Sequence, residues 1–187
     1  LEPHGFAERN ELYLRHAVDL AARAADRALG DAGIDYARVD AIVAVSSSGI
    51  ATPGLDALVM EQRPFRRDVE RLPVFGLGCA GGVRGLARAA ALGLARPGST
   101  VLLLVVELCG LTFRHADRSK SNLIASALFG DGAAAAVVST AGEGPRLTAW
   151  GEHTWPNSLD IMGWSVTDDG FGVPGLIVYV PAERFEK

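Results

Sequence analysis

The residues of this sequence best suited to chemistry lie in the stretch VFGLGCAGGVRGL, residues 74–86, where Cys79 stands among glycines between an apolar run and a helical pattern. A cysteine in a tight strand-to-helix turn is displayed as a nucleophile, and the positive end of the following helix favours the reactive thiolate form. Gly78 and Gly81 permit the sharp turn and leave room for an acyl group. Backbone N–H groups of such a turn can hold an oxyanion. The pattern predicts covalent acyl transfer through Cys79.

The same turn allows two other interpretations. Residues 76–81 match G-x-G-x-x-G, the phosphate-binding turn of dinucleotide folds, and Glu107 closes the next predicted strand, where a ribose-binding carboxylate would lie. Dinucleotide folds usually present this turn near their beginning, whereas a helix and a strand precede it here. In the other interpretation Cys79 is a small buried hydrophobic residue, as cysteine usually is. The residues around Cys79 leave all three interpretations open.

Cys109 is the second cysteine, and it follows the end of the strand predicted over residues 101–107. At that position its sulfur can face the same crevice as Cys79, so we expect it to line a pocket, with core packing as the alternative. A disulfide is disfavoured in a reducing compartment. With two cysteines and no C-x-x-C or H-x-x-x-H spacing, the sequence predicts no metal site.

Composition narrows the class of protein. The chain has 187 residues, of which 49% are hydrophobic, and this suffices for a packed core. A net charge of −4 offers no basic field for nucleic acid. The most apolar run, TVLLLVVELCGL, is far shorter than the roughly 20 residues of a membrane span. The first residues show no apolar core of a secretory signal, and the lack of an initiator Met suggests that upstream sequence is missing. The low cysteine usage fits a reducing cytoplasm best.

Helical and strand patterns alternate along the chain. Apolar residues at helical intervals predict a helix over residues 10–32, which Gly33 ends. The other predicted helices cover residues 54–62, 80–95 and 120–128, and the predicted strands cover residues 39–48, 73–77, 101–107, 133–138, 146–152 and 175–180. This alternation predicts an α/β fold with a mainly parallel sheet and helices on both faces. Working groups gather at the carboxyl ends of the strands in such sheets.

Four segments resemble, in the family's order, the type III polyketide synthases, which include chalcone synthase and the bacterial alkylresorcinol and alkylpyrone synthases. They are VDAIVAVSSSGIATPGLDALVMEQ, RLPVFGLGCAGGVRGLARAA, VLLLVVELCGLTFRHADRSKSNLIASALFGDGAAAAVV and WPNSLDIMGWSVTDDGF. The resemblance implies a thiolase-like fold and iterative condensation of malonyl-coenzyme A with an acyl-coenzyme A starter. The coenzyme A thioesters are substrates, and no bound cofactor is implied. The sequence of these segments is most similar to that of the bacterial synthases that act on fatty acyl starters.

The resemblance implies a role for each matching residue. Cys79 in GLGCAGG matches the nucleophile that holds the growing polyketide. Phe129 in ALFGDG matches the aromatic gatekeeper between the coenzyme A tunnel and the cavity. Ser48 in SSSG, and Cys109 and Thr112 in ELCGLTF, match positions that shape the cavity.

The resemblance also implies how the chain is divided and assembled. Residues 1–140 match the N-terminal αβαβα half of the fold, and residues 141–187 match a linker and the incomplete beginning of the C-terminal half. The segment GIATPGLD resembles the loop near the family's dimer interface, so a homodimer is expected. The family's catalytic His and Asn lie in its second half, and none of the four histidines here stands in their context. We therefore expect either a fragment that lacks both ends of the protein or a truncated product that cannot complete the reaction.

Two further hypotheses stay open beside a polyketide synthase and the dinucleotide binder. A ketoacyl carrier protein synthase III shares the implied fold, although its cysteine stands in a different glycine context. A non-catalytic half-domain that pairs with another chain is the other alternative, because half of a fold exposes apolar surface.

Overall fold

The computed structural model describes residues 5–114, 116–158, 162–167 and 170–176. The helices are α1 (Phe6–Ala32), α2 (Leu55–Gln62), α3 (Gly81–Ala95) and α4 (Lys120–Leu128). The strands are β1 (Ala41–Val45), β2 (Glu70–Val74), β3 (Thr100–Leu108), β4 (Asp131–Ser139), β5 (Met162–Thr167) and β6 (Gly170–Leu176). Short 3₁₀ turns lie at Tyr36–Arg38 (η1), Gly78–Ala80 (η2) and Cys109–Thr112 (η3).

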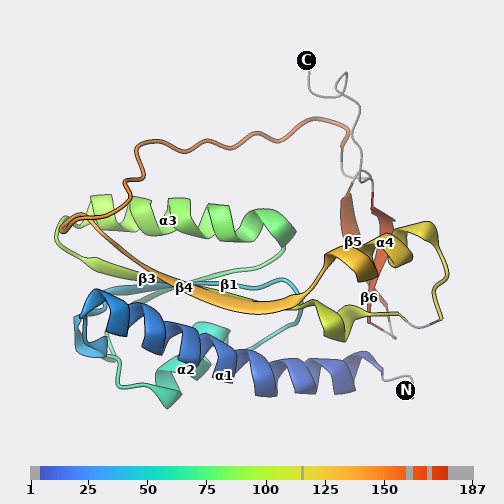
Figure 1. Ribbon diagram of the computed structural model, residues 1–187, viewed down its shortest axis with the longest axis horizontal. Helices are drawn as coiled ribbons and strands as arrows, with labels where there is room; N and C mark the ends of the chain where they lie inside the picture. The colour runs from blue at the N-terminus through green and yellow to red at the C-terminus, as the bar shows by residue number, and fades with distance from the viewer. Residues whose placement is uncertain (1–4, 115, 159–161, 168–169, 177–187) are drawn as a thin grey trace.

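A four-stranded sheet with the order β2-β1-β3-β4 forms the middle layer of the molecule. Strand β1 pairs in parallel with both β2 and β3, while β4 runs antiparallel to β3. Helices α1 and α2 cover one face of the sheet and α3 covers the other (Figure 1). Strands β5 and β6 form a separate antiparallel pair. The predicted α/β fold with a mainly parallel sheet and helices on both faces is confirmed.

Strand β3 forms the centre of the core because apolar layers bury both of its faces. Leu102, Leu104 and Val106 pack in the cluster that includes α1 and α2, whereas Val101 and Leu103 pack in the cluster beneath α3. Alternate side chains of a strand point to opposite faces, so a strand covered on both sides is a continuous apolar run. This explains why the most hydrophobic segment of the sequence is a strand.

Helix α1 is a long helix with a face of small side chains against the sheet. Its buried residues are Tyr13, Ala17, Val18, Ala21, Ala22, Ala25 and Leu29. Gly33 ends the helix in the left-handed conformation, with a φ of 62°, and its N–H donates to the carbonyl of Gly30. The end of the helix is as predicted, while its start lies at Phe6, four residues before the predicted start.

The strand predicted over residues 73–77 is wrong in position, because β2 covers Glu70–Val74. Strand β2 is an edge of the sheet, and the exposed side chains of Glu70 and Arg71 interrupt the apolar pattern on which the prediction relied. Charged residues are favoured at sheet edges, where they oppose pairing with another chain. Pro73 lacks a backbone donor and is tolerated in an edge strand.

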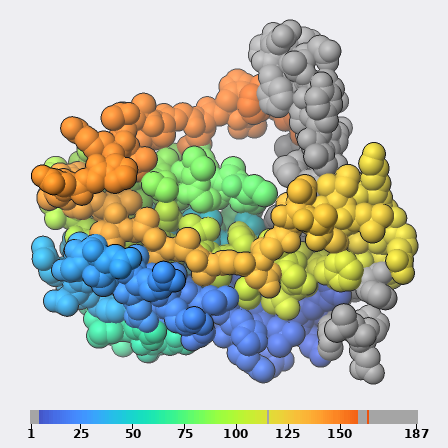
Figure 2. Space-filling view, in the orientation of Figure 1, coloured from blue at the N-terminus to red at the C-terminus, as the bar shows by residue number. Residues whose placement is uncertain are grey.

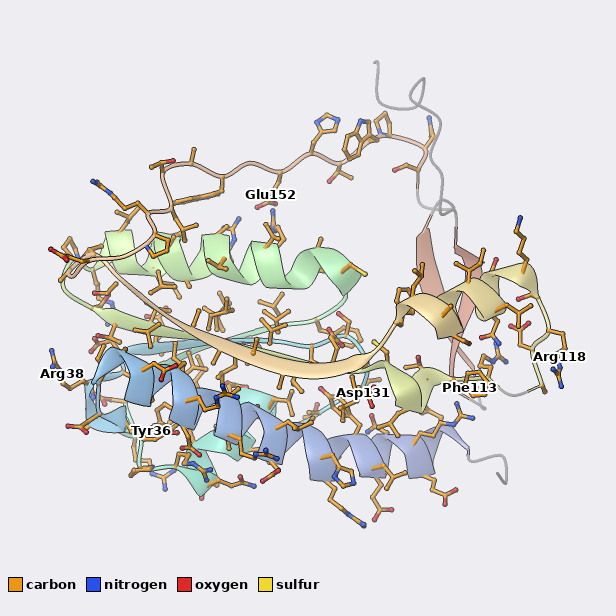
Figure 3. The ribbon with its side chains drawn as sticks, viewed as in Figure 1. Tyr36, Arg38, Phe113, Arg118, Asp131 and Glu152 are labelled. Carbon is orange, nitrogen blue, oxygen red and sulfur yellow. The ribbon has the colours of Figure 1, made fainter. Side chains whose placement is uncertain are left out.

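The strand predicted over residues 146–152 is also wrong, since these residues have no regular structure. They belong to an exposed segment that follows β4 and lies above α3 (Figure 2). Glu152 points toward α3 (Figure 3) and forms ion pairs with Arg84 and Arg88 of that helix. An alternating pattern needs a neighbouring strand to form a ladder, and this segment lies over a helix instead. Of the strand predicted over residues 175–180, only its first two residues are described, at the end of β6.

Candidate active site

The candidate site lies where the carboxyl ends of β1, β2 and β3 meet at one edge of the sheet. Strand β1 continues into the serine run at residues 46–48, β2 leads into the glycine turn that contains Cys79, and β3 leads into η3. The N–H of Ser46 donates to the carbonyl of Val74 over 3.2 Å, which joins the ends of β1 and β2. Working groups of parallel sheets gather at such an edge.

Cys79 lies in η2, two residues before the first residue of α3, and it is exposed. Gly76 and Gly78 have φ values of 82° and 50°, which glycine adopts without the strain that other residues suffer. A Cβ on Gly81 would lie 2.7 Å from Cγ1 of Val45, so only glycine lets the start of α3 lie this close to β1. The interpretation of Cys79 as a buried hydrophobic residue is therefore wrong, and the turn displays the sulfur as predicted.

Each of the three consecutive serines makes a different hydrogen bond. The Tyr13 hydroxyl donates to Oγ of Ser46 over 2.7 Å. Oγ of Ser47 accepts the N–H of Gly78 over 3.2 Å, and Oγ of Ser48 accepts the N–H of Leu108 over 2.8 Å. All three serines are buried. The serine run therefore joins α1, the nucleophile turn and the end of β3.

Glu107 has an internal partner. The N–H of Ser47 donates to both oxygens of its carboxylate, over 2.9 and 3.1 Å. A carboxylate that binds ribose must present its oxygens to a ligand, and Glu107 instead joins β3 to the loop after β1. This contact removes one of the two features that favoured a dinucleotide site.

Several hydrogen bonds hold η3 in place. The N–H of Gly110 donates to Oδ1 of Asp131 over 2.7 Å, and the Thr112 hydroxyl donates to the carbonyl of Cys109 over the same distance. Arg9 of α1 donates to the carbonyl of Phe113 over 2.6 Å. Figure 3 shows Asp131 and Phe113 on either side of this turn. The start of β4 and the start of α1 therefore fix the loop that carries Cys109.

The Cys109 thiol has a pKa raised to about 11, chiefly because burial disfavours its charged form. The neighbouring Glu107, Asp131 and Cys79 side chains raise this pKa further. The side chain of Cys109 is half-buried and unbridged. At neutral pH Cys109 is a thiol, and Cys79 is the cysteine that the fold displays.

The other predicted site residues lie on the surrounding elements. Ser48 is buried, Thr112 is half-buried in η3, and Phe129 is half-buried at the end of α4, where its N–H donates to the carbonyl of Ala125. The described contacts show how each residue is held, and their roles at a cavity stay predictions. His115 lies outside the described residues. In the described part of the chain, no group of three or more His, Cys, Asp or Glu side chains is arranged to hold a metal ion.

Sequence reasoning missed the parts played by Tyr13, Ser47 and Asp131. Each makes its contact with a residue at least 21 positions away along the chain, so no local pattern reveals it. The run of three hydroxyl residues at the end of a predicted strand was the available signal for Ser47.

Tyr13 provides a test of the packing beneath the serine run. Burial is the main cause that raises the pKa of its hydroxyl from 10.0 to about 12. The neutral hydroxyl is therefore favoured by the folded state, and this stabilisation is complete below pH 10 and is lost as the pH rises toward 12. Two pH units correspond to about 3 kcal/mol of unfolding free energy.

We expect Tyr13→Phe to be about 1–2 kcal/mol less stable than the native protein at pH 7, because the Ser46 hydroxyl loses its partner. Between pH 10 and 12 the native protein should lose stability more steeply, so the difference shrinks. Urea unfolding at pH 7, 10, 11 and 12 measures both effects. A constant difference across that range would contradict the burial of the Tyr13 hydroxyl.

Comparison with known proteins identifies a protein family that matches this chain. The family model described as "Chalcone and stilbene synthases, N-terminal domain" matches residues 3–142. A putative chalcone synthase of Bacillus subtilis is 40% identical over 186 residues, which cover 92% of this chain and 51% of the relative. A 1,3,6,8-tetrahydroxynaphthalene synthase of Streptomyces peucetius is 41% identical over 174 residues, covering 90% of this chain and 46% of that enzyme.

Solved structures agree with these relatives. The 1,3,6,8-tetrahydroxynaphthalene synthase of Streptomyces coelicolor, a bacterial type III polyketide synthase, superposes with a TM-score of 0.92 at 34% identity. That match covers 98% of this chain and 53% of the enzyme. Germicidin synthase of the same organism superposes with a TM-score of 0.86 at 34% identity, covering 91% of this chain and 45% of the enzyme. The chain spans about half the length of the relatives it matches.

Proposed function

Because this chain belongs to the chalcone and stilbene synthases, the type III polyketide synthases, we propose that it supplies the nucleophile of an enzyme that condenses an acyl-coenzyme A starter with malonyl-coenzyme A. The observation that carries this proposal is the exposed Cys79, held in a glycine turn at the start of α3. A thiolate at that position can attack a thioester carbonyl, and the N-terminus of a helix favours the negative charge.

In the acyl transfer, one thioester bond forms and another breaks. The Cys79 thiolate attacks the carbonyl carbon of the acyl-coenzyme A, and the coenzyme A thiolate leaves and takes up a proton. Loss of carbon dioxide from malonyl-coenzyme A then produces an enolate, which attacks the Cys79 thioester. A carbon–carbon bond forms and the Cys79 thiolate is released. We expect the His and Asn that promote this second step in the family to lie outside this chain.

The cavity roles follow the same proposal. Cys109, Thr112 and Ser48 lie on the loops that follow β3 and β1, next to the nucleophile turn in the fold, and we propose that they shape the space for the acyl chain. Phe129, where α4 meets β4, is proposed as the gatekeeper at the coenzyme A tunnel. We also propose that residues 1–140 are the N-terminal half of the fold and that residues 141–187 begin the next.

A homodimer is part of the proposal. Asn10 accepts the N–H of Ile50 and donates to its carbonyl, over 2.8 and 2.9 Å, while 42% of the Ile50 side chain is exposed. Phe75 and Val83, on either side of Cys79 along the chain, are exposed as well. Exposed apolar side chains on a loop that hydrogen bonds hold in place favour association with a second chain. Sedimentation of the protein at micromolar concentration should give the mass of two chains.

A reducing compartment, the cytoplasm, fits the free thiols of Cys79 and Cys109. Among the described helices, none has the length and apolar character that crossing a bilayer requires.

The test is acylation of the protein by a coenzyme A thioester. We expect incubation with hexanoyl- or longer acyl-coenzyme A to add the mass of one acyl group per chain, and the peptide that contains Cys79 to carry it. Intact-mass and peptide spectrometry measure both. No adduct with any starter, or an adduct on another residue, would contradict the proposal.

The choice of extender separates this proposal from a ketoacyl carrier protein synthase III. After acylation, we expect malonyl-coenzyme A to serve as the extender in the complete protein. A requirement for malonyl carrier protein would instead favour the other condensing enzyme.

A further inference from the structure

Ser47 is the member of the serine run that touches the nucleophile turn, and its side chain is 1% exposed. Its hydroxyl accepts the N–H of Gly78, the residue directly before Cys79, over 3.2 Å. Its own N–H is held by both oxygens of Glu107. The end of β3, the loop after β1 and the turn after β2 are therefore joined by a continuous chain of hydrogen bonds that stops one residue before the sulfur.

We propose that Ser47 is a positioning residue for the Cys79 nucleophile, with Glu107 fixing Ser47 in turn. Glu107 accepts from the backbone of Ser47 and sets the place of its hydroxyl. The hydroxyl then sets the orientation of the peptide between Leu77 and Gly78. The role of Ser47 as a positioning residue depends on the proposed acyl transfer. The hydrogen bonds that hold the turn do not depend on it.

The turn needs such a restraint because glycine makes it soft. Gly76 and Gly78 both have positive φ values, and glycine passes between left-handed and right-handed regions at little cost. The N–H of Ala80 donates to the carbonyl of Leu77 over 3.2 Å, which closes the turn after Gly78, whereas Ser47 holds it from the β1 side. Without Ser47 the Leu77–Gly78 peptide can rotate and carry Cys79 away from the start of α3. Displacements of about 1 Å can cost roughly a hundredfold in rate.

Ser46 provides a matched control on the same loop. It is buried like Ser47, and its hydroxyl likewise accepts one hydrogen bond from a buried donor. The donor is the Tyr13 hydroxyl on α1, outside the nucleophile turn. Ser46→Ala and Ser47→Ala therefore each leave one donor without its acceptor, and only Ser47→Ala releases the turn.

The experiment compares Ser47→Ala, Ser46→Ala and Ser47→Thr in the protein with two measurements. The first is steady-state product formation by the complete protein, separated into kcat and KM. The second is the rate at which iodoacetamide alkylates Cys79, which needs no coenzyme A substrate. We expect Ser47→Ala to lower kcat about tenfold or more, to leave KM within about twofold, and to change the alkylation rate at least about threefold. Ser46→Ala should leave both rates within about twofold, and Ser47→Thr should restore most of kcat, because it keeps the hydroxyl.

Native kinetics in Ser47→Ala, or an equal loss in Ser46→Ala, would overturn the proposal. If Ser47→Ala does not fold, Glu107→Gln replaces it in the experiment. This substitution keeps the shape of the Glu107 side chain but weakens its hydrogen bonds to Ser47, so we expect a loss of kcat smaller than that expected for Ser47→Ala. Native kinetics in Glu107→Gln would contradict the proposal. If the native protein forms no acyl adduct, the proposed function fails. The alkylation rates then still decide the positioning role, because a change confined to Ser47→Ala supports it and equal rates in all variants overturn it.

Discussion

Replacing Cys79 with alanine is expected to abolish the acyl adduct and to lower product formation in the complete protein by about a thousandfold or more. Loss of a covalent nucleophile removes the intermediate itself, and in other enzymes such losses reach several orders of magnitude. Cys79 is the exposed cysteine of the chain, and it alone lies in the turn that leads into α3. Intact-mass spectrometry after incubation with acyl-coenzyme A and chromatography of the polyketide product measure the two effects.

Cys109 cannot replace Cys79 at neutral pH. Its pKa of about 11 leaves about one molecule in ten thousand as the thiolate at pH 7. Its side chain is half-buried, which limits access as well. We therefore expect Cys109→Ala to retain the acyl adduct, even where the change in the pocket alters the products. An adduct that survives Cys79→Ala and disappears in Cys109→Ala would reverse the assignment.

Much of the fold could be predicted because local patterns dominate there. Helix α4 covers Lys120–Leu128 as predicted, and its start has a local cause, since the Ser119 side chain accepts the N–H of Asn122. The end of α1 at Gly33 is equally local. The apolar run of β3 predicts a strand buried on both faces. These features depend on residues within a few positions of one another.

The errors lie where the environment overrides the pattern. Strand β2 begins at the charged Glu70, because an edge strand needs no continuous apolar run. Residues 146–152 alternate like a strand, yet they have no strand partner and are tied to α3 through Glu152. Whether a strand has a neighbour is a property of the tertiary structure, and single-sequence patterns do not contain it.

Only some features of the candidate site, like those of the fold, could be predicted from local patterns. The glycines around Cys79 predict an exposed nucleophile before a helix, and the structure confirms the exposure and the turn. The contacts that hold the turn come from Ser47 and Glu107, which are 60 positions apart in the chain. Glu107 also shows how a motif can mislead, because its place after a strand suggested a ribose ligand while its partner is the Ser47 backbone.

The close packing of α3 against the sheet leads to the second large expected effect, a loss of stability. Gly85 is buried, and a Cβ there would lie 2.7 Å from Cδ1 of Leu103 and 2.7 Å from Cγ2 of Val45. Both neighbours are almost fully buried on the α3 side of the sheet and have little space to move into. We expect Gly85→Val to cost about 3 kcal/mol or more of unfolding free energy, because the helix must shift away from β1 and β3.

Gly82 is the matched control in the same helix, since a Cβ there meets no atom within 4 Å. Gly82→Val should change stability by less than about 1 kcal/mol, because valine has a somewhat better helix propensity than glycine and no clash opposes it. Urea unfolding of both variants measures the difference. Because α3 carries the nucleophile turn at its start, a folded fraction of Gly85→Val should also acylate more slowly at Cys79. Equal stability of the two variants would contradict the close packing of α3 against β1 and β3 at Gly85.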